Sequence, residues 1–312
     1  MKKHNIIAMA LTSLMALPVI AQDSTPAVGD ILQGINMFTP EEGDPAYKVK
    51  ANEKYGTQWG VDMAYGLWNT EKVSDVKRHN NLALLHAQLN QRLIEDKANG
   101  GTWLRVEFSG SWGLDRESAQ SDTFFTEAYA TASGLHADAM GPHEGIFPEV
   151  ALMQYFAGKR ACLIAGMVNL TNYFDAVSIA NDSFSSFTND GFVNSTILPL
   201  VDSNIGGILQ VELNRNNYMM VAVSRTGCDS GYNPFNSDYC DGYAVVGEYG
   251  HIFADGAATL RINPFYTSTD VDMDDGTGER RRQNAGLVAS IEYTPCDPLT
   301  IYSRAGFAAK QY

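Results

Sequence analysis

The segment TWLRVEFSGSW, residues 102–112, shows most clearly the sequence pattern that indicates the fold. Its apolar residues alternate with polar ones such as Arg105 and Glu107. Successive side chains of a β-strand point to opposite faces, so this segment predicts a strand with one apolar and one polar face. The segment LQVELN, residues 209–214, repeats the same alternation.

Similar runs, rich in aromatic and β-branched residues and separated by Gly, Asn, Asp and Pro, recur along most of the chain and predict about twelve strands. Strands of about ten residues, joined by connections of very unequal length, are typical of a transmembrane barrel. A soluble β-sandwich gives the same alternation and is the alternative. We predict an all-β, antiparallel transmembrane β-barrel of the outer-membrane porin type. The predicted strands are 58–68, 82–93, 102–112, 124–135, 147–156, 161–170, 206–214, 217–225, 243–253, 258–266, 284–293 and 299–307.

The charge balance argues against a nucleic-acid partner. The 312 residues include 36 acidic and 22 basic ones, which gives a formal net charge of −14. A surface that binds a phosphate backbone needs an excess of positive charge, and this chain has the opposite.

The chain divides into three parts. Residues 1–21 join a basic start to an apolar run ending at Val19-Ile20-Ala21, which is typical of a secretory signal peptide. Residues 22–55 are polar and lack a clear period, so we expect a flexible lead-in. Residues 56–312 contain the strand pattern and form the predicted barrel domain. Export followed by barrel formation predicts the cell outer membrane as the location, with its lipid as a partner.

The four cysteines suggest one disulfide. Cys228 and Cys240 bracket a loop-like segment, and a disulfide that closes this loop is expected in an oxidising compartment. Cys162 and Cys296 either pair with each other or are independent thiols. The acidic stretch 270–279 lacks the Gly and Glu positions of a calcium-binding EF-hand loop, so we expect neither a metal nor a cofactor.

The stretch GMVNLTNYFDAVSIANDSFSSFTNDGFVNSTILPLVDSNIGG, residues 166–207, resembles the carbohydrate-selective porin family (the OprB family). Weaker similarity runs from about Leu82, through residues 100–113, to residues 299–307, so the resemblance covers about three quarters of the chain. The residues that carry it are Tyr173-Phe174-Asp175, Asn181-Asp182, Phe184, Phe187, Asn189, Phe192, Leu198-Pro199 and Gly206-Gly207.

The resemblance implies a function and a larger barrel. Family members form barrels of sixteen strands, so this chain is either a truncated member or a smaller barrel, the former being favoured. They allow passive, selective diffusion of neutral carbohydrates such as glucose, and porins of this size are often trimers, so a homo-oligomer is compatible with the resemblance. The stretch 171–205 then either folds into the pore or forms an external loop packed by its phenylalanines. In the first case Asp175, Asn181, Asp182 and Asn189 could meet the solute.

A porin needs no catalytic group, because pore width and lining side chains set its selectivity. Hydrogen-bonding side chains on the polar faces of the predicted strands could contact sugar hydroxyls, and aromatic rings could stack on sugars. The predicted pore-lining residues are Arg105, Glu107, Glu127, Tyr129, Gln210, Glu212, Glu248, Arg261, Asn263, Glu292, Tyr302 and Arg304.

Two other functions compete with the porin. A barrel-borne outer-membrane hydrolase would need a nucleophile and a base, but the chain has six histidines and neither a GxSxG nor an HExxH motif. We therefore expect that the protein is not an enzyme. A secreted or surface β-sheet binding protein, similar to an adhesin, would be recovered without detergent.

Overall fold

The structure, a computed structural model, describes residues 45–69, 79–114, 143–177, 194–201, 203–226, 242–272, 280–296 and 299–309. It contains one α-helix, α2 (Ala46–Tyr55), and two short 3-10 helices, η2 (Leu170–Asn172) and η4 (Ala254–Gly256), within these residues. None of the helices in this part of the chain is long and apolar enough to cross a membrane. The strands are β1 (Thr57–Asn69), β2 (His79–Ile94), β3 (Thr102–Gly113), β4 (His143–Phe156), β5 (Ala161–Val168), β6 (Asn204–Asn214), β7 (Asn217–Thr226), β8 (Gly242–Phe253), β9 (Ala258–Asp272), β10 (Arg280–Cys296) and β11 (Leu299–Ala308).

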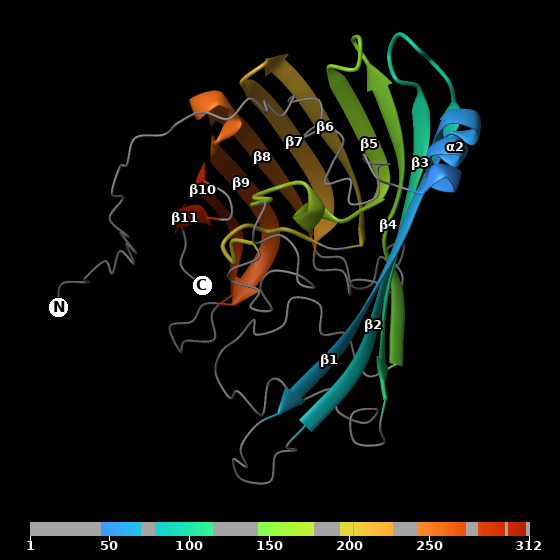
Figure 1. The fold of residues 1–312 in the computed structure, drawn as a ribbon. Coiled ribbons are helices and arrows are strands. Elements are labelled where there is room, and N and C mark those ends of the chain that lie inside the picture. Colours follow the sequence, from blue (N-terminus) through green and yellow to red (C-terminus); the bar gives the residue numbers. More distant parts are fainter. Residues whose placement is uncertain are drawn as a thin grey trace, which may run out of the picture.

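The strands form a single 11-stranded sheet in which each strand pairs with its neighbours in sequence. Every pairing is antiparallel. The sheet curves around the segment that contains η2 (Figure 1). Strands β1 and β11 are its two edges, and they do not pair with each other in the described part of the chain.

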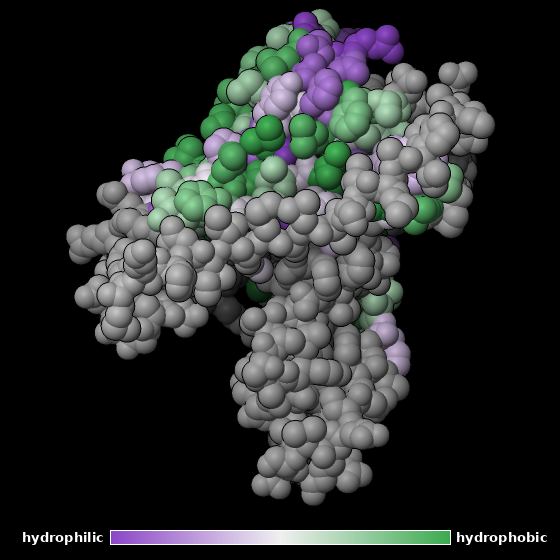
Figure 2. Space-filling model, turned by 90° about the vertical axis from the view of Figure 1, so that its left-hand side faces the viewer, coloured by the Kyte–Doolittle hydropathy of each residue, from purple (hydrophilic) through white to green (hydrophobic). Residues whose placement is uncertain are grey.

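The two faces of the curved sheet differ in polarity, as the alternation predicts. On β6, Leu209 and Leu213 lie exposed on the convex face, whereas Gln210 between them is buried on the concave face. Exposed apolar side chains occupy the convex face of most strands, and Figure 2 shows hydrophobic residues over much of the coloured part of the face in view, with hydrophilic residues above them at the top. An apolar outer surface and a polar inner one are the arrangement of a barrel in lipid.

The two ends of the sheet are also unlike. At one end the strands are joined by the short connections 95–101, 157–160, 215–216, 254–257 and 297–298. At the other end the connections 70–78, 114–142, 169–203, 227–241 and 273–279 are longer in most cases. Outer-membrane barrels have short turns on the periplasmic side and longer loops outside the cell, which assigns the short-connection end to the periplasm.

Eleven of the predicted strands are present, and the twelfth, 124–135, lies outside the described residues. The predicted signal peptide, residues 1–21, also lies outside them. Helix α2 occupies the last 10 residues of the segment expected to be a lead-in. Its sequence lacks an apolar face, so periodicity gave no sign of a helix there. The helix ends at Gly56, whose φ of 65° suits the left-handed C-terminal cap.

Candidate functional site

The concave face of the sheet gathers ten of the twelve predicted pore-lining residues. They come from β3, β6, β8, β9, β10 and β11. Glu127 and Tyr129 lie outside the described residues, so nothing tests their placement. The ten that the structure describes are Arg105, Glu107, Gln210, Glu212, Glu248, Arg261, Asn263, Glu292, Tyr302 and Arg304.

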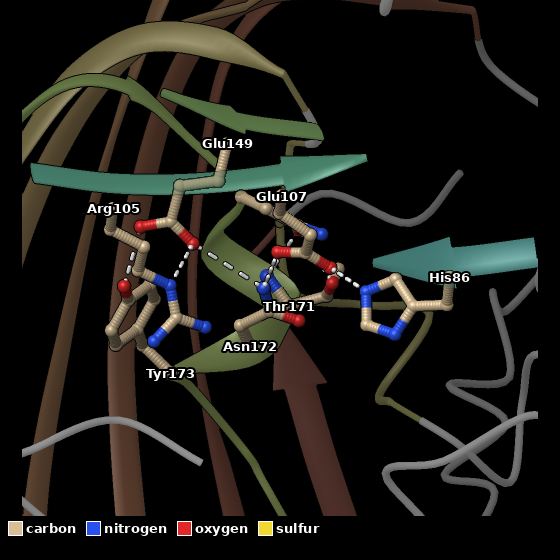
Figure 3. Close-up of polar contacts among 8 residues, drawn as sticks. His86, Arg105, Glu107, Glu149, Thr171, Asn172 and Tyr173 are labelled. Atoms are coloured by element: carbon tan, nitrogen blue, oxygen red, sulfur yellow. Dashed lines mark hydrogen bonds and ion pairs between the residues drawn. The ribbon is translucent and has the colours of Figure 1, made fainter. Parts of the chain in front are cut away.

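A buried ion pair forms one end of a polar network on this face (Figure 3). The Arg105 Nε lies 3.1 Å from Glu149 Oε2, and both side chains are almost fully shielded from solvent. The Tyr173 hydroxyl donates a hydrogen bond of 2.5 Å to the other oxygen, Glu149 Oε1. Burial raises the pKa of Tyr173, so its hydroxyl keeps the proton that it donates. Arg105 also lies 5.7 Å from the centre of the Tyr173 ring, in cation–π contact.

Glu107 extends the same network toward β2. The imidazole Nε2 of His86 lies 2.7 Å from Glu107 Oε1. The amide of Asn172 donates to Glu107 Oε2 at 2.8 Å and, over 3.4 Å, to Glu149 Oε2. Asn172 therefore bridges two carboxylates that stand opposite each other on neighbouring strands β3 and β4.

A third buried carboxylate, Glu248, accepts hydrogen bonds from neutral donors. The Tyr218 hydroxyl donates to Glu248 Oε1 at 2.7 Å. Glu248 Oε2 accepts from the Asn263 amide at 2.7 Å and from the backbone N–H of Asp175 at 2.8 Å. Hydrogen bonds from several donors offset the cost of burying this carboxylate.

The remaining arginines of the concave face are paired as well. Both terminal nitrogens of Arg261 lie within 3.2 Å of Glu292 Oε2. The Arg304 Nε lies 2.8 Å from Asp175 Oδ2. Arg304 also stands over the ring of Tyr302, with the guanidinium carbon 5.8 Å from the ring centre.

Residues 169–177 and 194–201, which we call the inner segment, lie against this face rather than outside the barrel. Asn172 and Tyr173 bind carboxylates of β3 and β4, as described above. Asp175 binds Glu248 of β8 and Arg304 of β11. Because these contacts reach strands far apart in the sheet, the inner segment bridges the concave face from one side to the other. Of the predicted constriction residues, Asp175 is placed here, and Asn181, Asp182 and Asn189 lie outside the described residues.

The inner segment packs against a row of apolar side chains on the sheet. Paired positions on β5 to β9 place buried apolar side chains side by side across the concave face. Burial of such side chains removes apolar area from water and holds the segment in place independently of its polar contacts. The residues in this contact are Ile164, Ile208, Ala222, Val246 and Phe265 of the sheet, and Leu170, Phe174 and Leu198 of the inner segment.

Asp175 is the most constrained residue of the inner segment. Its φ of 55° lies in the left-handed region, which Asp tolerates better than most residues. Its Oδ2 accepts from the backbone N–H of Ser195 at 2.8 Å, which joins the two parts of the segment. Burial raises the pKa of Asp175, and the neighbouring Arg304 opposes this shift only in part.

The positive charges of the concave face are compensated. Arg105, Arg261 and Arg304 each form an ion pair with a carboxylate. The carboxylates of Glu107 and Glu248 accept hydrogen bonds from neutral amides or hydroxyls. The face therefore offers many hydrogen-bonding groups with little uncompensated positive charge.

Sequence reasoning missed several members of the network. Glu149 and Tyr218 lie on strands whose concave faces are otherwise mostly apolar, so their segments show no polar alternation. A single charged residue flanked by Pro148 and Val150 was the only sign of Glu149. His86 stands among alternating polar residues of β2, and that pattern could have identified it.

The cysteine predictions have different outcomes. Cys162 is a buried free thiol on β5, and Cys296 is an exposed free thiol at the end of β10, so they do not pair. Cys228 and Cys240 lie outside the described residues, and their disulfide stays a prediction. No cluster of metal-ligating side chains occurs among the residues that the structure describes.

Neither a protein-family model nor a curated protein matches the sequence. A solved structure, the high-pH structure of Pseudomonas putida OprB, is similar over 80% of this chain, with a TM-score of 0.58 and 13% identity. The similar region spans 64% of that porin's length. A mutant porin of Rh. blastica matches 80% of this chain and 99% of its own, with 12% identity, but its TM-score of 0.22 is too low to support an argument. The resemblance seen in the sequence is thus confirmed at the level of the fold, and the chain has the fold of an outer-membrane porin.

Proposed function

We propose that the protein is an outer-membrane porin through which neutral carbohydrates diffuse passively. The observation that carries this proposal is the charge-compensated concave face, on which each of Arg105, Arg261 and Arg304 is paired with a carboxylate. A pore selects solutes by its width and by the donors, acceptors and charges that line it. A wall rich in hydrogen-bonding groups, on which the arginines are compensated by carboxylates, favours hydroxyl-rich neutral solutes over anions.

The apolar convex face supports the membrane location. Side chains such as Leu152, Val221 and Ile301 are between 43% and 49% exposed, although their backbones are paired within the sheet. In water, so much exposed apolar surface would favour association, whereas in a bilayer it meets lipid. This feature favours a membrane barrel over the secreted binding protein considered above. The porin fold likewise favours a channel over a hydrolase.

The proposed solute contacts are the partly exposed polar groups of the concave face. Among the predicted lining residues these are Glu212, Tyr302 and Arg304, whereas Glu107, Arg261 and Glu292 are buried. Sugar hydroxyls both donate and accept, so they suit a wall on which carboxylates and guanidinium groups alternate. Glucose and maltose are therefore the first solutes to test, and the assignment to carbohydrates rests in part on the similarity to OprB.

Liposome swelling tests the proposal. Detergent-refolded protein is reconstituted into liposomes, and swelling is compared for glucose, its anionic relative gluconate and its cationic relative glucosamine. These three solutes are nearly equal in size, so a difference in rate reports on charge rather than width. We expect glucose to enter faster than gluconate, with liposomes lacking protein as the control.

Two outcomes would overturn parts of this proposal. Equal rates for the three solutes would show a pore without the proposed selectivity. Absence of swelling by a folded, inserted protein would contradict the pore itself. Folding is checked separately by the change in electrophoretic mobility on heating.

A further inference from the structure

Helix α2 is fixed to the outside of the sheet rather than to its concave face. The Tyr47 ring stacks on the Trp59 ring of β1, with ring centres 6.2 Å apart. The carbonyl of Tyr55 accepts a 2.9 Å hydrogen bond from the Gln91 amide of β2. Gly56, which ends the helix, leaves no room for a Cβ beside Arg92, so the turn into β1 is tight. Figure 1 shows α2 beside the beginning of β1, at the short-connection end.

The surface beside the helix is a lipid-facing surface. Trp59, Val61, Met63 and Tyr65 alternate along β1 and are all exposed on the same side. Trp59 is the residue of this row nearest the helix. It lies at the end of the sheet that has the short connections, which is the periplasmic end. Aromatic residues gather where a barrel meets the headgroups, so α2 and Trp59 lie at the level of the periplasmic leaflet.

The charge of α2 is opposite to that of the chain. Lys48, Lys50 and Lys54 stand in the helix with Glu53 as its only acidic residue, although the chain carries a net charge of −14. The Lys48 Nζ lies 5.1 Å from the centre of the Trp59 ring, and the Lys54 Nζ lies 4.8 Å from that of Tyr55. Lysines that lay their stems along aromatic rings at an interface place their ammonium groups among lipid phosphates.

We propose that α2 is a binding site for anionic phospholipid headgroups of the periplasmic leaflet. The lysines bind the phosphates, while Tyr47, Tyr55 and Trp59 pack against the glycerol and upper acyl region. This arrangement would fix the depth of the barrel at β1, an edge strand that has a neighbour on one side only in the described part of the chain. A protein partner on the same surface is the competing occupant, and the experiment separates the two.

The test measures which lipid lies beside Trp59. The full chain is reconstituted into phosphatidylcholine vesicles that contain about 20 mol% of a brominated lipid, either phosphatidylglycerol or phosphatidylcholine. Bromine quenches the fluorescence of nearby indoles only. Surface lysines attract anionic lipid, so brominated phosphatidylglycerol should gather beside them. The chain has 4 tryptophans, so the contribution of Trp59 is taken as the difference from Trp59→Phe. We expect brominated phosphatidylglycerol to quench Trp59 at least about twofold more than brominated phosphatidylcholine does.

Matched variants assign the effect to the helix. A triple variant with Lys48→Gln, Lys50→Gln and Lys54→Gln should lose the stronger quenching by brominated phosphatidylglycerol. The corresponding variant with three Lys→Arg changes should keep it. A second control neutralises three exposed basic residues of the same end that lie in short connections. These residues are Lys97, Lys159 and Arg215.

Three results would overturn the proposal. The first is equal quenching of the wild type by both brominated lipids. The second is loss of the stronger quenching by brominated phosphatidylglycerol in the variant that alters the short connections. The attraction would then come from the whole periplasmic end of the sheet rather than from α2. The third is stronger quenching by this lipid that survives about 0.5 M NaCl, at which screening removes attraction between exposed charges. The wild type and Trp59→Phe decide the first and third results, so a lysine variant that fails to fold does not leave the proposal untested.

Discussion

Some residues of the concave face pack so closely on their neighbours that an added methyl group would clash. Gly250 on β8 stands opposite Tyr218 on β7, and a Cβ at this position would lie 2.0 Å from the Tyr218 ring. The ring is fully buried and holds its hydroxyl against Glu248. A larger residue at position 250 must therefore move the ring or the strand.

Gly250→Ala should destabilise the protein by about 1–3 kcal/mol, the usual cost of overpacking a filled site. The measurement is the midpoint of urea unfolding of the refolded barrel. Gly207→Ala is the matched control, because its nearest obstacle is the Ile164 carbonyl oxygen at 3.3 Å. If Tyr218 is the cause, Gly250→Ala should cost much less in a Tyr218→Ala background; an unchanged cost would contradict this explanation.

Asp175 should make stability depend on pH. Its pKa is raised above the ordinary value of 3.8, because burial outweighs the opposing effect of Arg304. A raised folded-state pKa means that ionisation costs more in the folded than in the unfolded protein. The contribution of this group to stability is therefore complete below a pH of about 3.8 and is lost as the pH rises through the raised pKa.

The Asp175→Asn side chain cannot ionise, so the variant does not lose stability through this titration. The free energy of unfolding of the wild type minus that of the variant should fall as the pH rises through this window. Unfolding in urea at a series of pH values measures both proteins, and the subtraction cancels the other titrating groups. A difference that is constant, or that increases with pH, would contradict the raised pKa.

At the scale of elements, the inner segment is held by two kinds of contact. Leu170, Phe174 and Leu198 pack on the apolar row of the sheet. Asn172 adds a polar bridge to Glu107 and Glu149. The apolar contacts favour the inward position in general, whereas the amide bridge sets where the segment lies along β3 and β4.

Asn172→Asp should displace this part of the inner segment and widen the pore. The new carboxylate would stand within 3.4 Å of two others, and like charges at that distance repel strongly away from bulk water. We expect a higher single-channel conductance in planar bilayers. Thr196→Asp adds the same charge at an exposed position of the inner segment and should leave conductance nearly unchanged. If both variants conduct like the wild type, the segment does not limit the pore.

Much of the sheet could be predicted, because alternation is a local property of sequence. The strand predicted at 102–112 is β3 to within one residue, and the one at 217–225 is β7 to within one residue. The contacts of the inner segment depend on strands far apart in the chain, such as β4 and β11. Nothing local to Asp175 indicates Arg304 as its partner. Helix α2 escaped prediction because its stability comes from docking on β1 rather than from an apolar stripe of its own.

At the scale of the whole molecule, charge is distributed unevenly between the surfaces. The chain has a net charge of −14, yet its basic residues include the ion-paired arginines of the concave face and the lysines of α2. On the concave face and the inner segment, carboxylates outnumber arginines. Glu248 accepts hydrogen bonds from neutral groups, and Glu107 accepts from Asn172 and also contacts His86. The inner wall thus has an acidic excess, although its arginines are compensated.

This balance predicts a weak preference for cations that disappears as salt rises. In a planar bilayer with a KCl gradient, the reversal potential should indicate cation preference near 0.1 M salt, where the Debye length is about 10 Å, and little preference near 1 M, where it is about 3 Å. Glu149→Gln leaves Arg105 without its carboxylate partner and should shift the reversal potential toward anions. Glu95→Gln removes an exposed charge at the periplasmic end and is the control. Anion preference in the wild type would mean that the arginines, rather than their carboxylate partners, dominate the field inside the pore.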